Sequence, residues 1–238
     1  MEIVEKHITR PDKCGYLPDR KWRLEYNFVA HLSSSEYLEL LNEGWRKYGH
    51  ALFRPVCQAC TECRPIRVLV DDFKLNRSQQ RTVRKNQDIE VRIESGEPNP
   101  QIFELYSRHH GSRAKEVGWP QPNFRDSIMH LSSLVDNPFP IQQWCHYLDG
   151  RLIGVCYADP LPLGLSAVYS FYDPGFKPRS LGTWMILSLI DYAKSLSMPY
   201  VYLGYFVEGC RSMTYKKNFL PHEVQSSDAT WHACFENS

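Results

Sequence analysis

The sequence predicts an α+β fold in which a smaller mixed α/β unit, residues 1–88, precedes a larger α+β unit, residues 89–238. Segments that alternate apolar and polar residues with the period of a strand are interspersed with segments of helical period. The chain of 238 residues, 42% hydrophobic and 23% charged, has the composition of a globular protein and enough length for a sizeable core. Disordered, collagen-like and coiled-coil classes are therefore excluded.

Net charge, apolar runs and cysteine content limit the kinds of protein that this chain can be. Twenty-eight Lys and Arg against 27 Asp and Glu leave a net charge of +1, so a nucleic-acid surface would need local segregation of charge. No apolar run approaches the ~18 residues of a membrane span, and Met1–Arg10 lacks the apolar stretch of a secretory signal. Eight cysteines in such a chain indicate thiols or metal ligands. We expect a cytoplasmic protein that makes no membrane contact.

In the first unit, residues 21–30 and 64–70 have strand patterns. Ser33 and Glu36 have the spacing of a capping box, which predicts a helix that runs to about Lys47 and stops at Gly49. A second helix is expected over residues 77–87.

In the second unit, strand and helix patterns follow one another over residues 89–219. Asp149-Gly150 predicts a tight hairpin. The expected strands are 89–94, 141–148, 152–157, 165–172 and 200–205, and the expected helices are 102–113, 125–135, 181–196 and 209–219.

This order of elements resembles the acyl-transferase fold of the GCN5-related N-acetyltransferases (GNAT), with a generic α+β sandwich as the alternative. In those enzymes a loop before a helix offers backbone N–H groups to the pyrophosphate of coenzyme A. Arg179, Ser180, Gly182 and Thr183 match that loop, but Trp184 stands where the family needs a small residue. The resemblance therefore implies the acyl-transfer scaffold without coenzyme A.

A cluster of cations precedes this module. Arg77, Arg81, Arg84 and Lys85 are spaced so that they share one helical face, and Arg54 would extend the patch. Such a face suits a nucleic acid, bound less tightly as salt rises. A merely solvated basic face is the alternative.

Four cysteines form a second candidate site. Cys57, Cys60 and Cys63 are arranged as C-x2-C-x2-C, and Cys14 lies about forty residues earlier. Four thiolates are suited to zinc or an iron–sulfur cluster. Reduced cysteines packed as small hydrophobes are the alternative.

Several motifs together resemble the aminoacyl-tRNA–protein transferases, in order over nearly the whole chain. They are C-G-Y-L-P from Cys14, F-R-P-V-C from Phe53, R-S-Q-Q-R from Arg77, S-A-V-Y-S-F-Y-D-P from Ser166 and L-G-Y-F-V-E-G-C-R-S-M-T-Y-K-K-N-F-L-P from Leu203. The size resembles the bacterial branch that moves leucine from leucyl-tRNA to proteins with N-terminal Asp or Glu, which marks them for degradation. Leu17 stands where the longer arginyl branch has its second N-terminal cysteine. This difference favours the leucyl branch and puts a eukaryotic-style four-cysteine cofactor site in doubt.

The resemblance implies a substrate pair and leaves two alternatives open. Aminoacyl-tRNA, with leucyl-tRNA favoured, would react with acidic N-termini, and the transfer would require no cofactor. Arginyl transfer to the same acceptors is one alternative. A non-catalytic RNA-binding or redox-sensing module built on the cysteines is the other.

The reaction would be aminolysis of an ester, for which positioning and charge stabilisation suffice. Tyr215 is expected to protonate the leaving ribose oxygen, while Glu208 and Asp173 orient the incoming ammonium and accept its proton through water. The acceptor carboxylate needs a cation, for which the candidates are Arg179, Arg211 and Lys216. Tyr172 and Tyr205 are expected to wall the adenosine or the leucine. For each of these residues, packing or solubility is the alternative.

Overall fold

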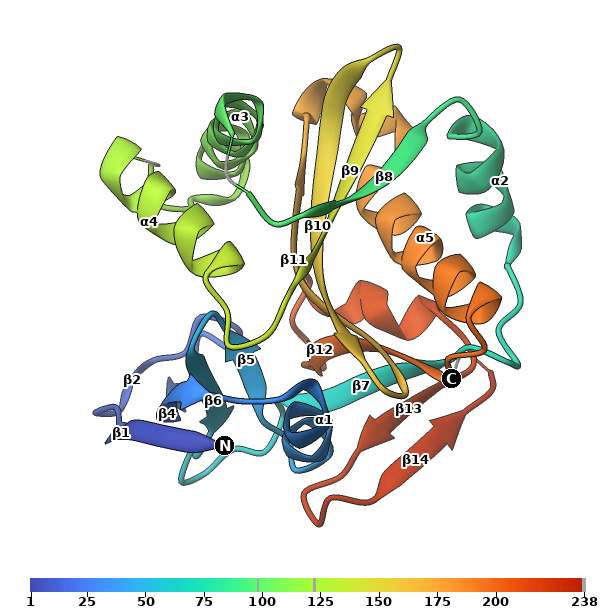
Figure 1. Ribbon diagram of the computed structural model, residues 1–238. Helices are drawn as coiled ribbons and strands as arrows, with labels where there is room; N and C mark the ends of the chain where they lie inside the picture. The colour runs from blue at the N-terminus through green and yellow to red at the C-terminus, as the bar shows by residue number, and fades with distance from the viewer. Residues whose placement is uncertain (98, 122, 237–238) are drawn as a thin grey trace.

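The computed structural model describes residues 1–97, 99–121 and 123–236. Its main feature is a twisted sheet with the strand order β14-β13-β7-β12-β11-β10-β9-β8 (Figure 1). The strands are β7 (Arg64–Leu69), β8 (Glu90–Ser95), β9 (Gln142–Leu148), β10 (Arg151–Leu161), β11 (Gly164–Tyr172), β12 (Tyr200–Phe206), β13 (His222–Gln225) and β14 (Trp231–Cys234).

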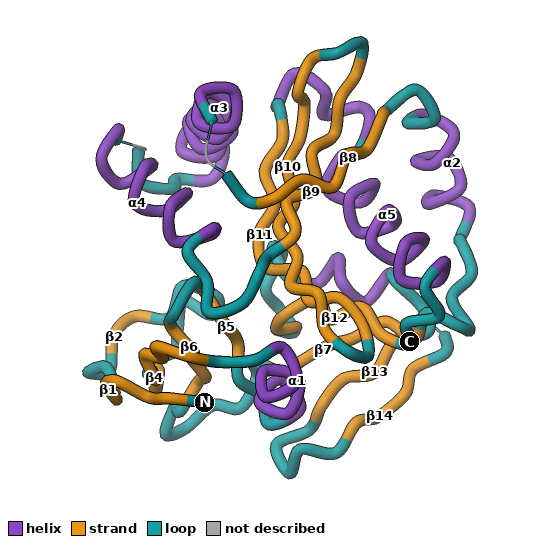
Figure 2. Tube along the Cα trace, viewed as in Figure 1, coloured by secondary structure: helices purple, strands orange, loops and turns teal. Residues whose placement is uncertain are grey.

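A smaller sheet of order β1-β4-β6-β5 lies beside one end of the large sheet, together with helix α1 and the ribbon β2-β3 (Figure 2). Its elements are β1 (Glu2–Ile8), β4 (Leu24–His31), α1 (Ser34–Asn42), β5 (Arg46–Tyr48) and β6 (Ala51–Pro55), and the ribbon is β2 (Asp12–Lys13) with β3 (Lys21–Trp22). The predicted capping box of Ser33 and Glu36 is present. The predicted extension of this helix to Lys47 is wrong, because Gly44 takes a φ of +86° and the chain turns into β5.

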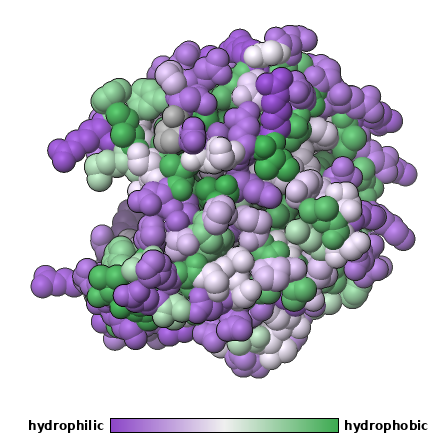
Figure 3. Space-filling view, viewed as in Figure 1, coloured by the Kyte–Doolittle hydropathy of each residue, from purple (hydrophilic) through white to green (hydrophobic). Residues whose placement is uncertain are grey.

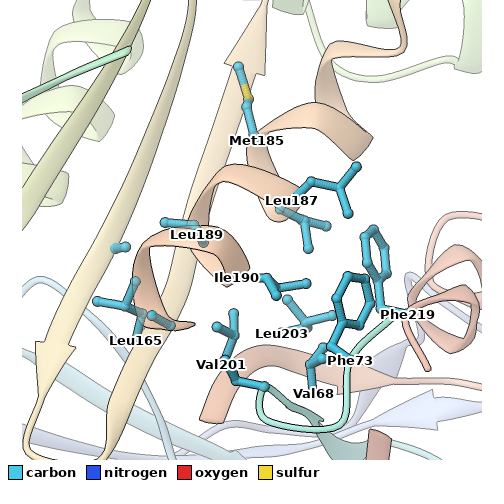
Figure 4. Close-up of a cluster of buried hydrophobic side chains, with 14 of the residues drawn as sticks. Val68, Phe73, Leu165, Met185, Leu187, Leu189, Ile190, Val201, Leu203 and Phe219 are labelled. Carbon is cyan, nitrogen blue, oxygen red and sulfur yellow. The ribbon is translucent and has the colours of Figure 1, made fainter. Parts of the chain in front are cut away.

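The large sheet carries helices on both faces. Figure 1 shows α2 (Arg77–Lys85) and α5 (Leu181–Ser195) on one face, and α3 (Pro100–Val117) and α4 (Phe124–Val135) on the other. The α5 face holds the largest buried cluster, in which Met185, Leu189 and Ile190 pack against Leu165 and Val201 of the sheet (Figure 4). The predicted α+β class is confirmed. Among the described residues, no helix combines the length and apolarity needed to cross a bilayer.

Two elements that come before residue 89 lie with the large sheet. Strand β7 pairs with β12 and with β13, and α2 packs against α5. The boundary between residues 88 and 89 therefore divides the sequence but does not divide the large sheet. Elements from both sides of the boundary belong to that sheet or pack on it.

The order β8-α3-α4-β9-β10-β11-α5-β12 is the one predicted from the acetyltransferase-like pattern. The hairpin at Asp149-Gly150 is also confirmed, since both residues have positive φ. The helix predicted over 209–219 is a short 3-10 turn, η2 (Thr214–Asn218). Strands β1, β13 and β14 were not predicted, because their charged and polar residues give no clear alternation.

Strands β11 and β12 open into a wedge. They run parallel and pair only between Gly164–Ser166 and Tyr200–Tyr202, and a bulge follows in β12. The strands are closest at Gly164, where an added Cβ would lie 2.1 Å from the carbonyl oxygen of Tyr200. Their carboxyl-terminal halves are unpaired with each other, which leaves room at this edge for side chains from η2 and from the small sheet.

Candidate functional site

The predicted anion-binding loop forms the amino terminus of α5. A 3-10 turn, η1 (Pro174–Arg179), leads to Ser180, which takes a left-handed conformation, and α5 begins at the next residue. The amides of Thr183 and Trp184 donate to the carbonyl of Ser180 at 3.0 and 3.1 Å. Within the described part of the chain no side chain caps this helix, so the positive end of its dipole remains available to an anion.

Tyr172 forms one wall of this amino terminus. An added Cβ at Gly182 would lie 3.4 Å from the Tyr172 ring, so glycine allows the helix to approach the aromatic side chain closely. The ring of His109, from α3, meets Tyr172 edge to face, and its Nδ1 lies 2.9 Å from the Tyr172 carbonyl oxygen. Burial lowers the pKa of His109, which makes it a neutral positioning group.

Helix α2 contacts this loop directly. The Asn86 amide donates to the carbonyl of Arg179 at 2.9 Å, and Lys85 Nζ donates to the carbonyl of Pro178 at 3.1 Å. Arg179 returns a hydrogen bond to the Lys85 carbonyl and forms a two-pronged ion pair with Asp88 at 2.6 and 2.9 Å. The structure therefore brings the predicted basic helix and the predicted loop side by side.

The cations of α2 are exposed, as a polyanion would require. Arg77, Arg81 and Arg84 all lie on the solvent side, while Gln79 and Thr82 of the same helix are buried. Arg54 lies elsewhere, on β6 of the small sheet. Its guanidinium pairs with Glu25 at 2.8 Å and stacks over Trp45. Arg54 therefore belongs to the small sheet and does not extend the exposed basic face of α2.

The turn η2 presents Tyr215 and Lys216 to the wedge. Tyr215 is exposed along part of its surface, but burial raises the pKa of its phenol to about 12, and Coulombic interactions with Cys156 and Tyr172 add to the rise. Lys216 is buried, and its Nζ donates to the carbonyl of Tyr205 at 2.6 Å. Desolvation and the nearby Arg46 lower the pKa of Lys216 to about 7.

The two predicted carboxylates are engaged in ion pairs. Asp173 is buried, with its Oδ2 at 2.5 Å from Arg151 and 3.4 Å from Arg108. Glu208 lies on an exposed turn and pairs with Arg64 at 3.4 Å. Each of the two carboxylates is thus occupied by an arginine partner.

Arg211 lies on the same surface turn as Glu208 and is exposed. Tyr205 is buried instead, and its hydroxyl donates to the carbonyl of Gly44 at 2.7 Å. The predicted aromatic wall is thus split, with Tyr172 at the start of α5 and Tyr205 against the small sheet.

The four predicted metal ligands line one cavity of about 640 Å³. Cys14, Cys57, Cys60 and Cys63 share this cavity with Tyr205. Burial and the neighbouring thiols raise the pKa of Cys63 to about 12, so it is a neutral thiol here. Within the part of the chain that the structure describes, no three Cys, His, Asp or Glu side chains are gathered as a ligand set. Zinc or iron–sulfur binding stays a prediction.

Trp184 packs over a small cluster with Leu181 and Phe176, and it also lines an apolar groove between α5, α2 and β8. Its indole nitrogen is buried and has no hydrogen-bond partner among the described residues. The bulky Trp184 side chain lies in the first turn of α5, where coenzyme A would need a small residue. The exclusion of coenzyme A stays a prediction.

Two family profiles cover most of the chain. Residues 12–81 match the profile described as "Arginine-tRNA-protein transferase, N terminus", and residues 101–226 match that of the C terminus. The chain therefore belongs to the arginine-tRNA-protein transferase family.

Curated relatives extend over nearly the whole chain. Proteins named aspartate/glutamate leucyltransferase are similar to it at 33% identity in Campylobacter jejuni strain RM1221 (91% of this chain and 90% of that one) and at 37% in Nitrosococcus oceani (94% of each). The protein of that name in Saccharophagus degradans is 38% identical over 91% of each chain. Among solved structures, L-PGS from Bacillus licheniformis is similar over 92% of this chain and 83% of that one, with a TM-score of 0.48 and 12% identity.

Some residues that shape the site were not predicted as part of it. Asn86 gives no signal in the sequence, because only the packing of α2 turns its amide to the Arg179 carbonyl. Arg46 lies in a stretch that was assigned to a helix, and its burial follows from the strand β5. His109 gives no signal of this role in the sequence, because its contact with Tyr172 depends on the docking of α3.

Proposed function

We propose that this protein transfers leucine from leucyl-tRNA to the α-amino group of proteins whose first residue is Asp or Glu. The observation that carries the proposal is the direct contact between the basic helix α2 and the loop at the start of α5. Arg77 and Arg81 lie on the helix whose last residues contact this loop, so a tRNA bound along them can continue to Ser180. The relatives' name supplies the transferred group and the acidic acceptor.

In this proposal the uncapped amino terminus of α5 binds the phosphate next to the terminal adenosine. Ser180, Gly182 and Thr183 supply the backbone there, and Tyr172 packs against the nucleoside or the leucine. Proximity then supplies much of the rate, since the ester is already activated and the attacking group is a free amine.

The amine attacks the ester carbonyl, a C–N bond forms, and the C–O bond to the ribose breaks. Tyr215 donates a proton to the leaving ribose oxygen, and its raised pKa keeps the phenol protonated at neutral pH. The proton of the attacking amine passes to water in this scheme, because Asp173 and Glu208 are both held by arginines, and water returns a proton to the Tyr215 phenolate.

The apolar surroundings of Tyr172 favour the transfer of leucine over the transfer of arginine. The described surroundings of Tyr172 include Ile153, Leu181 and Phe176, which are apolar. The nearby carboxylates of Asp88 and Asp173 are already paired with arginines. An arginine side chain would lack a free counter-charge there, whereas a leucine side chain needs none.

One assay tests the proposal. The protein is incubated with a peptide that begins with Asp and with a mixture of charged tRNAs, and the product is weighed by mass spectrometry. A mass gain of one leucine supports the proposal, and a mass gain of one arginine supports the alternative of arginyl transfer to the same acceptors. No gain, under conditions in which a known leucyltransferase is active, contradicts both. We place the reaction in the cytoplasm, where charged tRNA is available, and expect no cofactor requirement.

A further inference from the structure

Two buried cations meet at the bulge of β12. Arg46, from β5, is 5% exposed and donates from its NH2 group to the carbonyl of Gly204 at 3.0 Å. Lys216, from η2, is 7% exposed and donates to the carbonyl of the next residue, Tyr205. The bulge, at which Gly204 has a φ of +78°, thus brings cations from two separate elements to consecutive carbonyls.

Neither cation has a carboxylate partner. Among the described residues, no carboxylate oxygen lies within 4.0 Å of either side chain. The two carboxylates in the described core are occupied elsewhere: Asp159 pairs with Lys47 at 3.0 Å, and Asp173 pairs with Arg151. The NH1 group of Arg46 donates to the carbonyls of Trp45 and Leu41, and the guanidinium lies over the Tyr205 ring. Its Nε is buried, and no described residue accepts a hydrogen bond from it.

This arrangement is costly unless an anion binds. A buried charge loses its hydration, and a second like charge nearby adds repulsion. The depressed pKa of Lys216 has these two causes, desolvation and Arg46. A bound anion would compensate both charges and would accept the free N–H of Arg46.

Position and size select the kind of anion. The pair lies at the bulge of β12, and Lys216 directly follows Tyr215, which is proposed to act on the ester. The phosphates of a tRNA already have the exposed face of α2 and the open end of α5. A site this deeply buried suits a small group at the end of a chain.

We propose that Arg46 and Lys216 bind the side-chain carboxylate of the acceptor's N-terminal Asp or Glu and so determine its acidic specificity. This inference rests on the proposed function. An acceptor that begins with Asn would leave two buried cations uncompensated, and a site built for a polar group rejects analogues that lack it. Of the three cations predicted for this role, Lys216 is retained, since Arg179 is paired with Asp88 and Arg211 lies on the surface.

The test measures the acceptor and the donor separately. For Arg46→Gln and Lys216→Met, KM is determined for peptides that begin with Asp or with Asn, and for leucyl-tRNA. We expect KM for the Asp peptide to rise about tenfold or more, the preference for Asp over Asn to fall by a similar factor, and KM for leucyl-tRNA to stay within about twofold. Arg46→Lys, which keeps the charge, should restore part of the preference.

Three results would overturn the inference. An unchanged KM for the Asp peptide removes the site, and an equal loss for Asp and Asn peptides indicates structural support only. A raised KM for leucyl-tRNA with unchanged acceptor KM would indicate a phosphate site. Because Lys216→Met keeps the shape of the side chain and removes an uncompensated charge, it remains informative if Arg46→Gln fails to fold.

A direct binding experiment separates this inference from the proposed function. A fluorescent peptide that begins with Asp is titrated with the wild-type protein and with Lys216→Met in the absence of tRNA. Tight binding that Lys216→Met weakens supports the acceptor site, even if leucine is not the group transferred. Equal binding by both proteins contradicts the inference, even if leucyl transfer is observed.

Discussion

Tyr215 is the residue with the most specific proposed chemical role. Removal of its hydroxyl in Tyr215→Phe leaves the ring in place, so binding should change little. We expect kcat to fall about 10²- to 10⁴-fold, the usual range for the loss of a general acid, with KM for leucyl-tRNA nearly unchanged. Steady-state kinetics with an Asp peptide provide the measurement.

Tyr192→Phe is the matched control, because Tyr192 lies on α5 and packs edge to face against Trp144 in the main core cluster. It should retain kcat within about twofold. If Tyr215→Phe behaves like this control, the leaving oxygen takes its proton from another source.

At this scale the sequence predicts chemistry better than it predicts surroundings. The motif residues Tyr172 and Gly182 lie in contact at the start of α5, and Tyr215 is near enough to Tyr172 to interact with it electrostatically. The pairing of Asp173 with Arg151, by contrast, joins side chains brought together by β10 and β11. Such long-range ion pairs have no local signature, so a free base and a neutralised carboxylate look alike in the sequence.

The basic face of α2 is the element most open to a test. Reversal of two charges in Arg77→Glu with Arg81→Glu should weaken tRNA binding at low salt and reduce the slope of log K against log salt by about 2. Both side chains are exposed, so the fold should remain intact. Binding is measured by filter retention of leucyl-tRNA at several salt concentrations, with circular dichroism to check the fold.

The matched control reverses two exposed charges at the other end of the molecule, Lys6→Glu with Arg10→Glu, in and just after β1. It should leave the salt slope unchanged. Equal weakening by both double variants would show a general effect of net charge and would contradict a binding face on α2.

Elements with local signals were predicted well, and those with tertiary causes were not. The capping box of α1 and the Asp149-Gly150 hairpin depend on neighbouring residues and are confirmed. The early end of α1 depends on the positive φ of Gly44, and the short η2 depends on packing of Phe219 into the core. Helical periodicity alone continues past both points.

The whole molecule depends on a junction between its two sheets. Lys47 of β5 in the small sheet pairs at 3.0 Å with Asp159 of β10 in the large sheet, and both side chains are fully buried. The space-filling view shows hydrophilic and hydrophobic residues mixed over this side of the molecule, with a recess at its left edge (Figure 3). This buried pair ties the two sheets together.

Lys47→Met leaves the Asp159 carboxylate buried and unpaired, which should lower the free energy of unfolding by about 3–5 kcal/mol. The double variant Lys47→Met with Asp159→Leu removes both charges and should recover most of the loss. Urea unfolding of the three proteins provides the values. A single variant as stable as the wild type would show that the pair contributes little at this junction.

The interleaving of the chain is the feature that the sequence shows least. Strand β7 reads as part of the first unit, yet it lies between β12 and β13. Neither its length nor its apolar pattern identifies its neighbours in the sheet. The contact between α2 and α5 follows from this crossing, and with it the continuous path proposed for the tRNA.

A cross-link from the 3′ end of the tRNA tests that path most directly. A leucyl-tRNA analogue with a stable amide linkage and a photoreactive terminal adenosine is bound, irradiated and mapped by mass spectrometry. The proposed tRNA path predicts cross-links to residues 172–184, and the double variant Arg77→Glu with Arg81→Glu should suppress them. Cross-links confined to the cavity of Cys14 and Cys57 would place the reactive end elsewhere and contradict the proposed site.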